Sequence, residues 1–597
     1  MGPSSAPGRP YLIVLLLAAL LYAAQLGRAY VGFLIDDAYY VMAARSLLQG
    51  RYTDLVRADT PPLIHFLPGL PLFLAPWVAC VAPHWQLLQG LAVALLLAAA
   101  ALLNRWLEGR LTGRQRFWAV LLFAFNPAVV RYCSLVTSEA WFLVLWLLIL
   151  SRLDAVLGRQ PRAGDPWLLA LLLGWAALTR PEGIILTAAA AWLALSPQRR
   201  ARLWPALAGA GAIWASWLLR NYWVSRNVSD YLGEWRADLR SGPIWSNWGA
   251  VLDCLFVQSA GLLAPQAGYG PWRALVLLGG LALALLGLRE FLKRCPDPAS
   301  RAAAAAWGLY LAVHLLWRPL DVRYFLPLLP LLSVFLVLGL TLLLGRAGGA
   351  RWLGWSAAVL LAGTYAVQDA RLLLDGVTTP PSGSGRNPTA TWSRVKSLLP
   401  EDAPLLSNNG PTVCLYTGHQ AYPLPVGIKD ADEFLYLLAQ KDIRHILLFE
   451  PITDVSPAHQ RAWLRVRQWL RSEPRRLAPV FVQPEEGSSL YRVATSGAFA
   501  RAYELTLGAR RDFGLGAWPA GFAKLDEALA LEPGLPSAVN DYAVAASLTG
   551  RNLPQAARRL EELLRRQPGA PQTRLNLARV YLKQGRPAEA RRALRRP

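Results

Sequence analysis

Cysteine is scarce in this chain, with five scattered among 597 residues. There is no CxxC motif and no spacing typical of a zinc site. This pattern indicates neither a disulfide framework nor a cysteine metal site. The sequence also lacks an A-x-A cleavage pattern between the apolar run at 11–30 and the first acidic residues. We therefore expect an uncleaved first helix rather than a secretory leader.

Acidic side chains are also few: 38 Asp and Glu stand against 61 Lys and Arg, a formal net charge of +23. Much of the basic excess before residue 372 lies in short loops between apolar runs, where it indicates membrane topology. We therefore expect no nucleic-acid partner. Hydrophobic residues, in contrast, make up 54% of the chain and the mean hydropathy is +0.29. This composition predicts an α-helical polytopic membrane protein.

About eleven apolar segments are long enough, or nearly so, to cross a bilayer. A further apolar segment at 63–80 is rich in proline. Five basic loops fall on the same side as the N-terminus only if 63–80 does not cross, so we expect 63–80 to lie in the interface. An odd number of spans places everything after about residue 373 outside the cytoplasm. The predicted spans are 11–34, 86–104, 117–132, 139–153, 167–180, 182–197, 204–220, 271–292, 303–317, 322–344 and 352–372.

The same topology brings most of the remaining polar residues to the outer face. For any single residue, a helix end that meets water is the simpler explanation. The set is harder to explain in that way, because ionisable groups at membrane depth are costly and tend to be functional. The residues are Asp36, Asp37, Asp59, His65, Ser138, Glu139, Arg180, Glu182, Arg220, Asn221, Arg318, Asp321 and Arg323.

Two of these acids, Asp36 and Asp37, are adjacent and directly follow the first span. Neighbouring carboxylates can share a divalent cation or a proton. A cation would neutralise a phosphate, whereas a free carboxylate can deprotonate an acceptor hydroxyl. Nearby arginines can bind a phosphate through paired hydrogen bonds. The pair therefore indicates a reaction between a lipid phosphate and a polar acceptor at the membrane surface, with Mg²⁺ or Mn²⁺ left open.

Several stretches resemble, in the same order, motifs of the membrane glycosyltransferases with the type C (GT-C) fold. That family includes protein O-mannosyltransferases, aminoarabinose transferases and Rgt-type bacterial sugar transferases. The resemblance covers roughly residues 10–375. The stretches are IDDAYYVMAARSLLQGRY, DTPPLIHFLPGLPLF, FNPAVVRYCSLVTSEAWFLVLWLL, GWAALTRPEGIIL, LLRNYWV and VRYFLPLLPLLSVFL.

The resemblance implies a hexosyl or pentosyl transferase with a polyprenyl-phosphate-linked sugar donor. It also implies a site at the outer face and inversion at the anomeric carbon, with an acidic residue as the base. By position, Asp36 is the expected base and Asp37 its partner or a metal ligand. This sequence has two aspartates where Asp-Glu is frequent, so the base and the need for a metal stay open. The expected substrate-binding residues are Glu139, Arg180, Glu182, Arg220, Asn221, Arg323, Tyr324 and His65. For Arg180 and Glu182, an ion pair that closes two helices is the alternative to donor contact.

Three segments follow the membrane domain expected at 1–375. Residues 376–389 form a linker rich in proline, glycine and serine, and 390–495 read as a small α/β domain. Within this domain, short strands are expected at APLLSNN, RHILLF and SLYRVA, and amphipathic helices at DADEFLYLLAQK and HQRAWLRVRQWLR. Residues 499–597 contain units about 35 residues apart, with Pro533 and Pro568 at matching positions. This period is typical of tetratricopeptide (TPR) helical repeats and suggests a protein partner.

Two other functions are left open. A transporter or flippase needs polar residues near the midplane of its helices, where these spans are almost entirely apolar. A lipid-phosphate-dependent ligase or phosphotransferase would use the same acids and arginines. We expect a multi-pass protein of the inner (plasma) membrane in a bacterial cell envelope, with its C-terminal domains outside the cytoplasm. Its partners would be the bilayer, the donor lipid and a glycan, lipid or protein acceptor.

Overall fold

The computed structural model describes residues 9–158, 160–226, 248–262, 271–316, 321–346, 351–375, 387–428, 430–450 and 457–595. Most of the linker expected at 376–389 lies outside these residues, as does Arg318. The chain forms two compact units. Unit 1 comprises residues 1–393, 411–418 and 452–454, and unit 2 comprises 394–410, 419–451 and 455–597.

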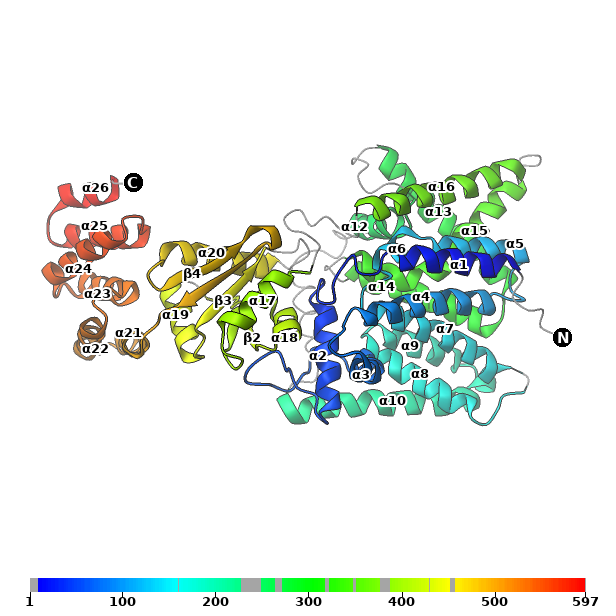
Figure 1. Cartoon of the computed structure of the whole chain (residues 1–597), viewed down its shortest axis with the longest axis horizontal. Helices are drawn as coiled ribbons and strands as arrows, with labels where there is room; N and C mark the ends of the chain where they lie inside the picture. The colour runs from blue at the N-terminus through cyan, green and yellow to red at the C-terminus, as the bar shows by residue number, and fades with distance from the viewer. Residues whose placement is uncertain are drawn as a thin grey trace. The chain divides into compact units, whose positions relative to one another are not determined.

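Unit 1 is a helical bundle (Figure 1). Among the described residues, four helices are both long and apolar enough to cross a membrane, and four shorter apolar helices accompany them. The four long ones are Leu87–Trp106, Ser138–Leu157, Arg273–Arg294 and Val322–Leu343. The elements are α1 (Arg9–Ala23), α2 (Asp36–Leu48), α3 (Gly69–Val81), α4 (Leu87–Trp106), α5 (Gly113–Ala124), α6 (Pro127–Tyr132), α7 (Ser138–Leu157), α8 (Asp165–Thr179), α9 (Gly183–Leu193), α10 (Pro197–Ser225), α12 (Trp248–Asp253), η2 (Cys254–Ser259), α13 (Pro271–Arg294), α14 (Pro298–Leu316), η3 (Val322–Leu328), α15 (Leu329–Arg346) and α16 (Arg351–Asp375).

All eleven predicted spans fall on helices, but two of them differ in detail. The first helix ends at Ala23 rather than near residue 34, because residues 24–35 form successive turns. The span expected at 117–132 is interrupted at Asn126. The Asn126 side chain accepts hydrogen bonds from the first backbone N–H groups of α6, and proline follows it. A new helix therefore begins there.

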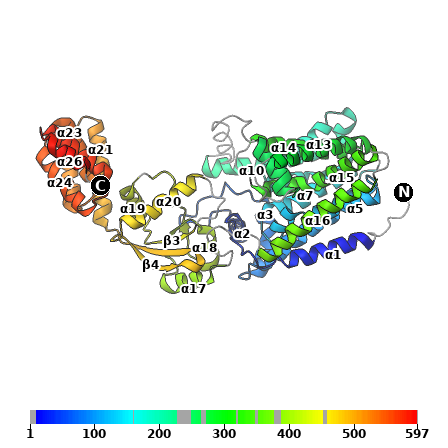
Figure 2. The same ribbon diagram turned by 90° about the horizontal axis from the view of Figure 1, so that it is seen from above.

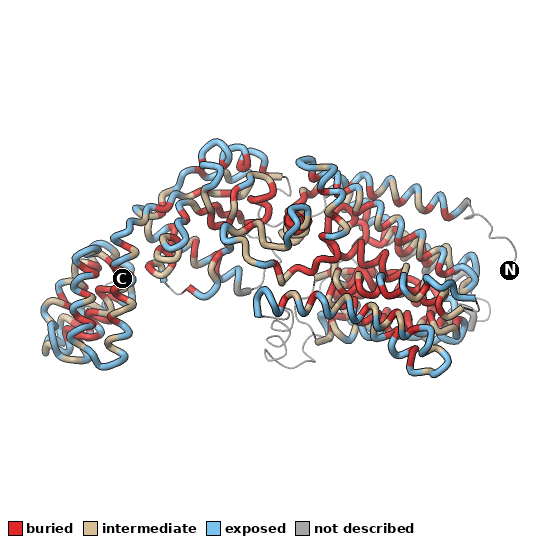
Figure 3. Tube along the Cα trace, turned by 90° about the horizontal axis from the view of Figure 1, so that it is seen from below, coloured by how far each residue is buried: buried red, intermediate tan, exposed pale blue. Residues whose placement is uncertain are grey.

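The outer surface of the bundle is apolar. In α1, Ile13, Leu16 and Leu20 are 56%, 65% and 69% exposed. The interior is continuous and buried, whereas exposed residues line the outside of the helices (Figure 3). Side chains of this kind on the periphery of a bundle suit lipid rather than water. The chain is therefore a membrane protein.

Helix α2, which begins with the two acids, does not run with the bundle. It crosses the direction of α1, α4 and α10 in Figure 1 and is seen nearly end-on in Figure 2. It packs against α3, the proline-containing helix within the segment expected to lie in the interface. This orientation suits a helix that lies along a membrane surface.

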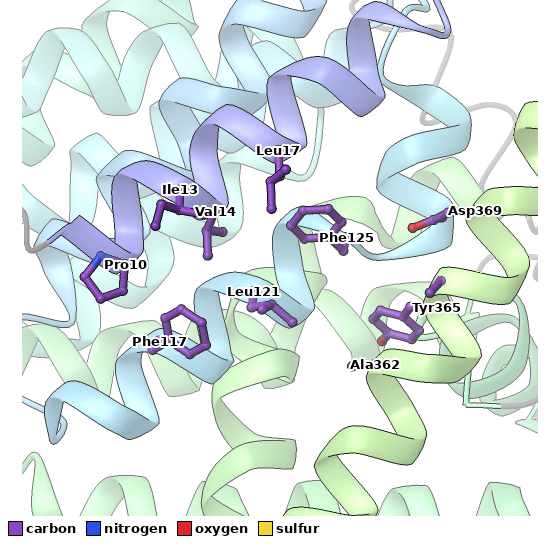
Figure 4. Close-up of a pocket in the computed structure, with 11 residues that line it drawn as sticks. Pro10, Ile13, Val14, Leu17, Phe117, Leu121, Phe125, Ala362, Tyr365 and Asp369 are labelled. Carbon is purple, nitrogen blue, oxygen red and sulfur yellow. The ribbon is translucent and has the colours of Figure 1, made fainter.

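A groove of about 350 Å³ lies between α1, α5 and α16. Its lining is apolar apart from Tyr365 and Asp369, which lie at one end (Figure 4). Asp369 is only 4% exposed, and its Oδ1 atom has no hydrogen-bond partner within the described part of the chain. The groove involves different helices from those that carry the acids described below.

Unit 2 contains a five-stranded sheet in the order β2-β1-β3-β5-β4. Strand β1 pairs in parallel with β2 and β3, whereas β5 is antiparallel to β3 and β4. The sequence predicted strands at β1, β3 and β5 and helices at α19 and α20. It missed β4, an edge strand whose register shifts after Pro479. The elements are β1 (Leu405–Ser407), β2 (Ala421–Tyr422), α19 (Ala431–Gln440), β3 (His445–Phe449), α20 (Pro457–Ser472), β4 (Leu477–Gln483), η4 (Pro484–Glu486) and β5 (Ser488–Val493).

Six helices follow the sheet as paired repeats, in agreement with the predicted helical tail. Their core is continuous with that of the α/β domain, since Phe434 of α19 and Tyr503 of α21 belong to one buried cluster. The α/β domain and the repeats therefore form one unit, although the sequence suggested a division between 495 and 499. The helices are α21 (Gly497–Gly514), α22 (Trp518–Leu531), α23 (Pro536–Thr549), α24 (Leu553–Arg566), α25 (Pro571–Lys583) and α26 (Pro587–Arg595).

Candidate active site

A tight turn at residues 32–37, here called the acid loop, presents the two aspartates. Gly32 has φ +104° and Ile35 has φ +67°. The Ile35 N–H donates to the Gly32 carbonyl over 3.2 Å, which closes the turn just before α2 begins. A β-branched residue in the left-handed region is strained by about 1–3 kcal/mol. The surrounding contacts must hold this turn in place.

The two aspartates of the acid loop have different environments. Asp37 is fully buried, and its Oδ2 accepts a hydrogen bond from the Gly32 N–H over 2.7 Å. Burial, opposed by this hydrogen bond and reinforced by the nearby charge of Asp36, raises the pKa of Asp37 to about 7. The Asp36 side chain, in contrast, is 34% exposed. Only Asp36 is open to a substrate in this arrangement.

Asp36 forms an ion pair with Arg323 of η3, with its Oδ2 atom 2.8 Å from Nη2. The Arg323 Nε atom lies 2.9 Å from Oδ2 of Asp321. Asp321 also caps η3, because its Oδ1 accepts hydrogen bonds from the Arg323 backbone N–H and from the Tyr132 hydroxyl. The Arg323 guanidinium is therefore fixed between two carboxylates. The sequence selected Arg323 but gave Asp321 no role in the site.

A second group of charges, here called the Arg180 cluster, joins the ends of α7, α8 and α9. Arg180 follows α8 and pairs with Glu139 at the start of α7 and with Glu182 just before α9. All three side chains are less than 10% exposed. Glu182 also lies 3.9 Å from Nε2 of His314 on α14. Helices that alternate in direction bring these ends to one face, as the topology predicted.

Tyr324 connects Arg323 with the Arg180 cluster. Its ring centroid lies 5.1 Å from the Arg323 guanidinium and 5.5 Å from that of Arg180. Tyr40 of α2 also lies near Glu139 and Arg180. Sequence reasoning missed Tyr40 and His314, since a lone tyrosine or histidine at a helix end has no distinctive pattern.

The two groups of charges described above contain more carboxylates than guanidinium groups. Asp36, Asp321, Glu139 and Glu182 surround two arginines. Each arginine forms ion pairs with two carboxylates in a largely buried setting, where opposite charges attract more strongly than in water. An incoming phosphate would therefore have to compete with an acid for its arginine.

Arg220, Asn221 and His65 lie in a different environment. The Arg220 guanidinium donates to the carbonyls of Tyr52 and Leu63 over 2.7 Å each and to the Asn221 side chain over 3.0 Å. It thereby fastens the loop after α2 to α10. His65 makes an edge contact with Phe66 in the same region. Their predicted roles in substrate binding stay predictions.

A cation shared by Asp36 and Asp37 does not fit this arrangement. Asp37 is buried and accepts backbone N–H groups, whereas Asp36 pairs with Arg323. Across the described ranges, no group of three or more His, Cys, Asp or Glu side chains is placed to hold a metal ion. We therefore derive no step through a cation; inhibition by a chelator would test the Mg²⁺ or Mn²⁺ that the sequence leaves open.

Comparison with solved structures of known proteins identifies the fold. Two solved structures of ArnT from Cupriavidus metallidurans are similar. One, bound to undecaprenyl phosphate, has a TM-score of 0.56 and 13% sequence identity and covers 82% of this chain and 99% of that chain. The other, in the apo state, has a TM-score of 0.54 and 12% identity and covers 81% and 97%. The chain has the GT-C fold. The fold expected from the sequence resemblance is confirmed, although identities this low establish the fold alone.

The sequence comparisons add one finding. A family model described as tetratricopeptide repeat matches residues 551–597, which confirms the predicted repeats there. No curated protein matches the chain.

Proposed function

We propose that this protein is an integral-membrane glycosyltransferase that moves a sugar from a polyprenyl-phosphate donor to an acceptor at the extracytoplasmic face. One observation carries the proposal: a partly exposed carboxylate, Asp36, is paired with Arg323 at a membrane-surface helix of a GT-C bundle. A base and a phosphate-binding group thus lie side by side. The ArnT structure bound to undecaprenyl phosphate supports a lipid phosphate as the carrier of the sugar.

The reaction proposed here is a direct displacement at the anomeric carbon. The acceptor oxygen attacks from the face opposite the phosphate, the bond from carbon to phosphate oxygen breaks, and the configuration inverts. Asp36 takes the proton of the acceptor hydroxyl, and the phosphate leaves with the bonding electron pair. As Asp36 becomes neutral, its pairing with Arg323 weakens, and the guanidinium gains freedom to bind the new phosphate charge. The Arg180 cluster holds Tyr324 in place and contributes to the electrostatic potential beside this site.

The acceptor-side chemistry requires a base that substrate can reach. Asp37 belongs to the acid loop, but its side chain is fully buried, so a substrate cannot reach it. Asp37 instead supports the turn that presents Asp36. A ligase or phosphotransferase would use the same groups but would carry the phosphate into its product, and a transporter or flippase would release its cargo chemically unchanged.

The test supplies purified protein in lipid nanodiscs with a panel of polyprenyl-phosphate sugars and hydroxyl acceptors, and the product is weighed by mass spectrometry. The proposal requires a product whose added mass is that of the sugar without phosphate. Asp36→Asn, which keeps the shape of the side chain, should reduce the rate by a factor of about 100 to 10000. The control Asp59→Asn changes an exposed aspartate paired with Arg57 and should retain the rate. A phosphate-containing product, or full activity in Asp36→Asn, would refute the proposal.

A further inference from the structure

Helix α18 (Gly410–Thr417) is separated from the membrane helices in sequence but belongs to their core. Residues 411–418 fall in unit 1, whereas the strands before and after them, β1 and β2, fall in unit 2. Cys414 and Leu415 are buried among the side chains of the bundle, and Tyr416 packs against the same core. This short helix is therefore a component of unit 1 that the sequence assigned to the α/β domain.

Thr412 of α18 contacts the acid loop directly. Its side chain is buried, and its hydroxyl donates to the Gly32 carbonyl over 3.0 Å. The same carbonyl accepts the Ile35 N–H, while the N–H of Gly32 donates to Asp37. Gly32 is thus held at both of its polar groups, and of its hydrogen bonds within the described residues the one from Thr412 comes from outside the loop.

The loop needs such support because its backbone is strained. Ile35 has a positive φ, and Asp36 follows it directly. Strained residues persist only where their surroundings hold them in place. The fit is also close: a Cβ atom added to Gly32 would lie 2.6 Å from both Cγ2 and Oγ1 of Thr412. Glycine is required at this position both for its φ and for the approach of α18.

Three further contacts fix α18 at this place. The Cys414 thiol lies 3.6 Å from the Leu55 carbonyl, and the Tyr416 ring meets Tyr30 edge-to-face at 6.4 Å between centroids. Trp392 also stacks on the Tyr416 ring, with an interplanar angle of 4°. The aromatic contacts orient the helix, so that Thr412 meets the loop in one register.

We propose that α18 completes the active site and that Thr412 is a positioning residue, which holds the acid loop so that Asp36 faces the acceptor. This inference rests on the proposed function, since it assigns a role in the same reaction. In this role Thr412 does not act on the reacting atoms itself. It acts through Gly32 on the direction in which α2 begins.

The test compares three substitutions in the full-length protein. Thr412→Val keeps the shape of the side chain and removes the hydroxyl, whereas Thr412→Ser keeps the hydroxyl. Thr417→Val is the matched control, because the hydroxyl of Thr417 donates to the Val413 carbonyl of its own helix over 2.7 Å. Loss of this hydrogen bond should let the acid loop shift and misplace the reacting carboxylate, so we expect kcat to fall about 10- to 100-fold in Thr412→Val. The KM for the donor should stay near its original value, and Thr412→Ser should retain most of kcat.

A second measurement does not depend on turnover. Hydrogen exchange of the backbone amides at 32–37 should become faster in Thr412→Val and remain slow in Thr412→Ser and Thr417→Val. In addition, Gly32→Ala should destabilise the protein less in a Thr412→Ala background than alone, because the second change removes the atoms that clash.

These outcomes separate the inference from the proposed function. If the unsubstituted protein transfers no sugar, the proposed function is refuted. The hydrogen-exchange and double-mutant results would still decide whether Thr412 holds the loop. Wild-type kcat and unchanged exchange in Thr412→Val would overturn the role of Thr412 and leave the transferase proposal intact.

Discussion

The Asp36 carboxylate lies 2.8 Å from the Arg323 guanidinium, although one follows the first helix and the other precedes α15. Arg323 uses its Nη2 atom for Asp36 and its Nε atom for Asp321, so the planar side chain spans two acids at once. In the reaction proposed above, a base held in this way keeps its place before the substrate binds. The same guanidinium would become available to a phosphate once Asp36 has taken a proton.

Arg323→Lys tests this double role. Lysine keeps the positive charge but cannot reproduce a planar pair of N–H donors. We expect the Kd for the polyprenyl-phosphate donor to rise about 10- to 100-fold, the range of one charge-assisted hydrogen bond, without loss of folding. Binding can be measured with labelled donor in nanodiscs. Arg444→Lys is the control, since Arg444 and its partner Asp442 are both highly exposed. An unchanged Kd in Arg323→Lys would remove Arg323 from the phosphate-binding role.

Membrane topology gives a prediction that is independent of chemistry. A reporter that is active only outside the cytoplasm should give a signal when fused after residue 597 and none when inserted near Arg110. The physical reason is the concentration of arginine in the loops on the N-terminal side of the membrane. A silent C-terminal fusion that is stably expressed would place the repeats in the cytoplasm and would imply that 63–80 crosses.

The Arg180 cluster should be sensitive to charge imbalance. Arg180→Leu leaves Glu139 and Glu182 buried without their cation, and breaking a buried pair typically costs about 3–5 kcal/mol. We expect a large fall in thermal stability in detergent. Adding Glu139→Gln and Glu182→Gln to Arg180→Leu should recover part of that loss, since no unpaired charge remains. If the single variant melts like the original protein, water reaches the cluster and the charges are not buried.

In the apolar groove, removal of a charged side chain should raise thermal stability rather than lower it. Asp369 ends a lining of apolar side chains, and its Oδ1 atom lacks a hydrogen-bond partner among the described residues. Burying an unsatisfied polar group costs about 1–3 kcal/mol, so Asp369→Leu should raise the melting temperature. Asp369→Asn should have a smaller effect because the amide is polar as well. A lower melting temperature in Asp369→Leu would show that the carboxylate binds a group not represented among those residues.

Much of the fold followed from local pattern. The apolar runs located the spans, and the 35-residue period located the repeats, because both are properties of neighbouring residues. The end of α1 was placed too late, since the residues after Ala23 are also apolar and only turn geometry stops the helix. Strand β4 was not among the predicted strands; it contains Pro479, which an edge strand tolerates.

The site was predicted unevenly for a related reason. Charged residues at helix ends could be assigned to one face from topology alone, which brought Asp36, Glu139, Arg180 and Arg323 into view. Their pairing could not be read from the sequence, because it depends on which helices are neighbours. The contact of Thr412 with Gly32 spans 380 residues, and no periodicity or motif encodes it.

Asp37 should make stability depend on pH in a direction unusual for a carboxyl group. Its pKa is raised from 3.8 to about 7 in the folded protein, chiefly because it is buried. Between about pH 4 and 7 the folded state therefore holds a proton that the unfolded state has lost. Stability must fall as pH rises through this window and then level off.

Asp37→Asn removes this dependence, since the amide cannot ionise and can still accept the Gly32 N–H. The variant should match the original protein near pH 4 and exceed its unfolding free energy increasingly toward pH 8. A shift of about three pKa units corresponds to a difference on the order of 4 kcal/mol. Denaturant unfolding at pH 4, 6 and 8 measures it, with Asp59→Asn as an exposed control. A constant difference across these pH values would mean that Asp37 is solvated, and the acid loop would then be open to water rather than sealed against α18.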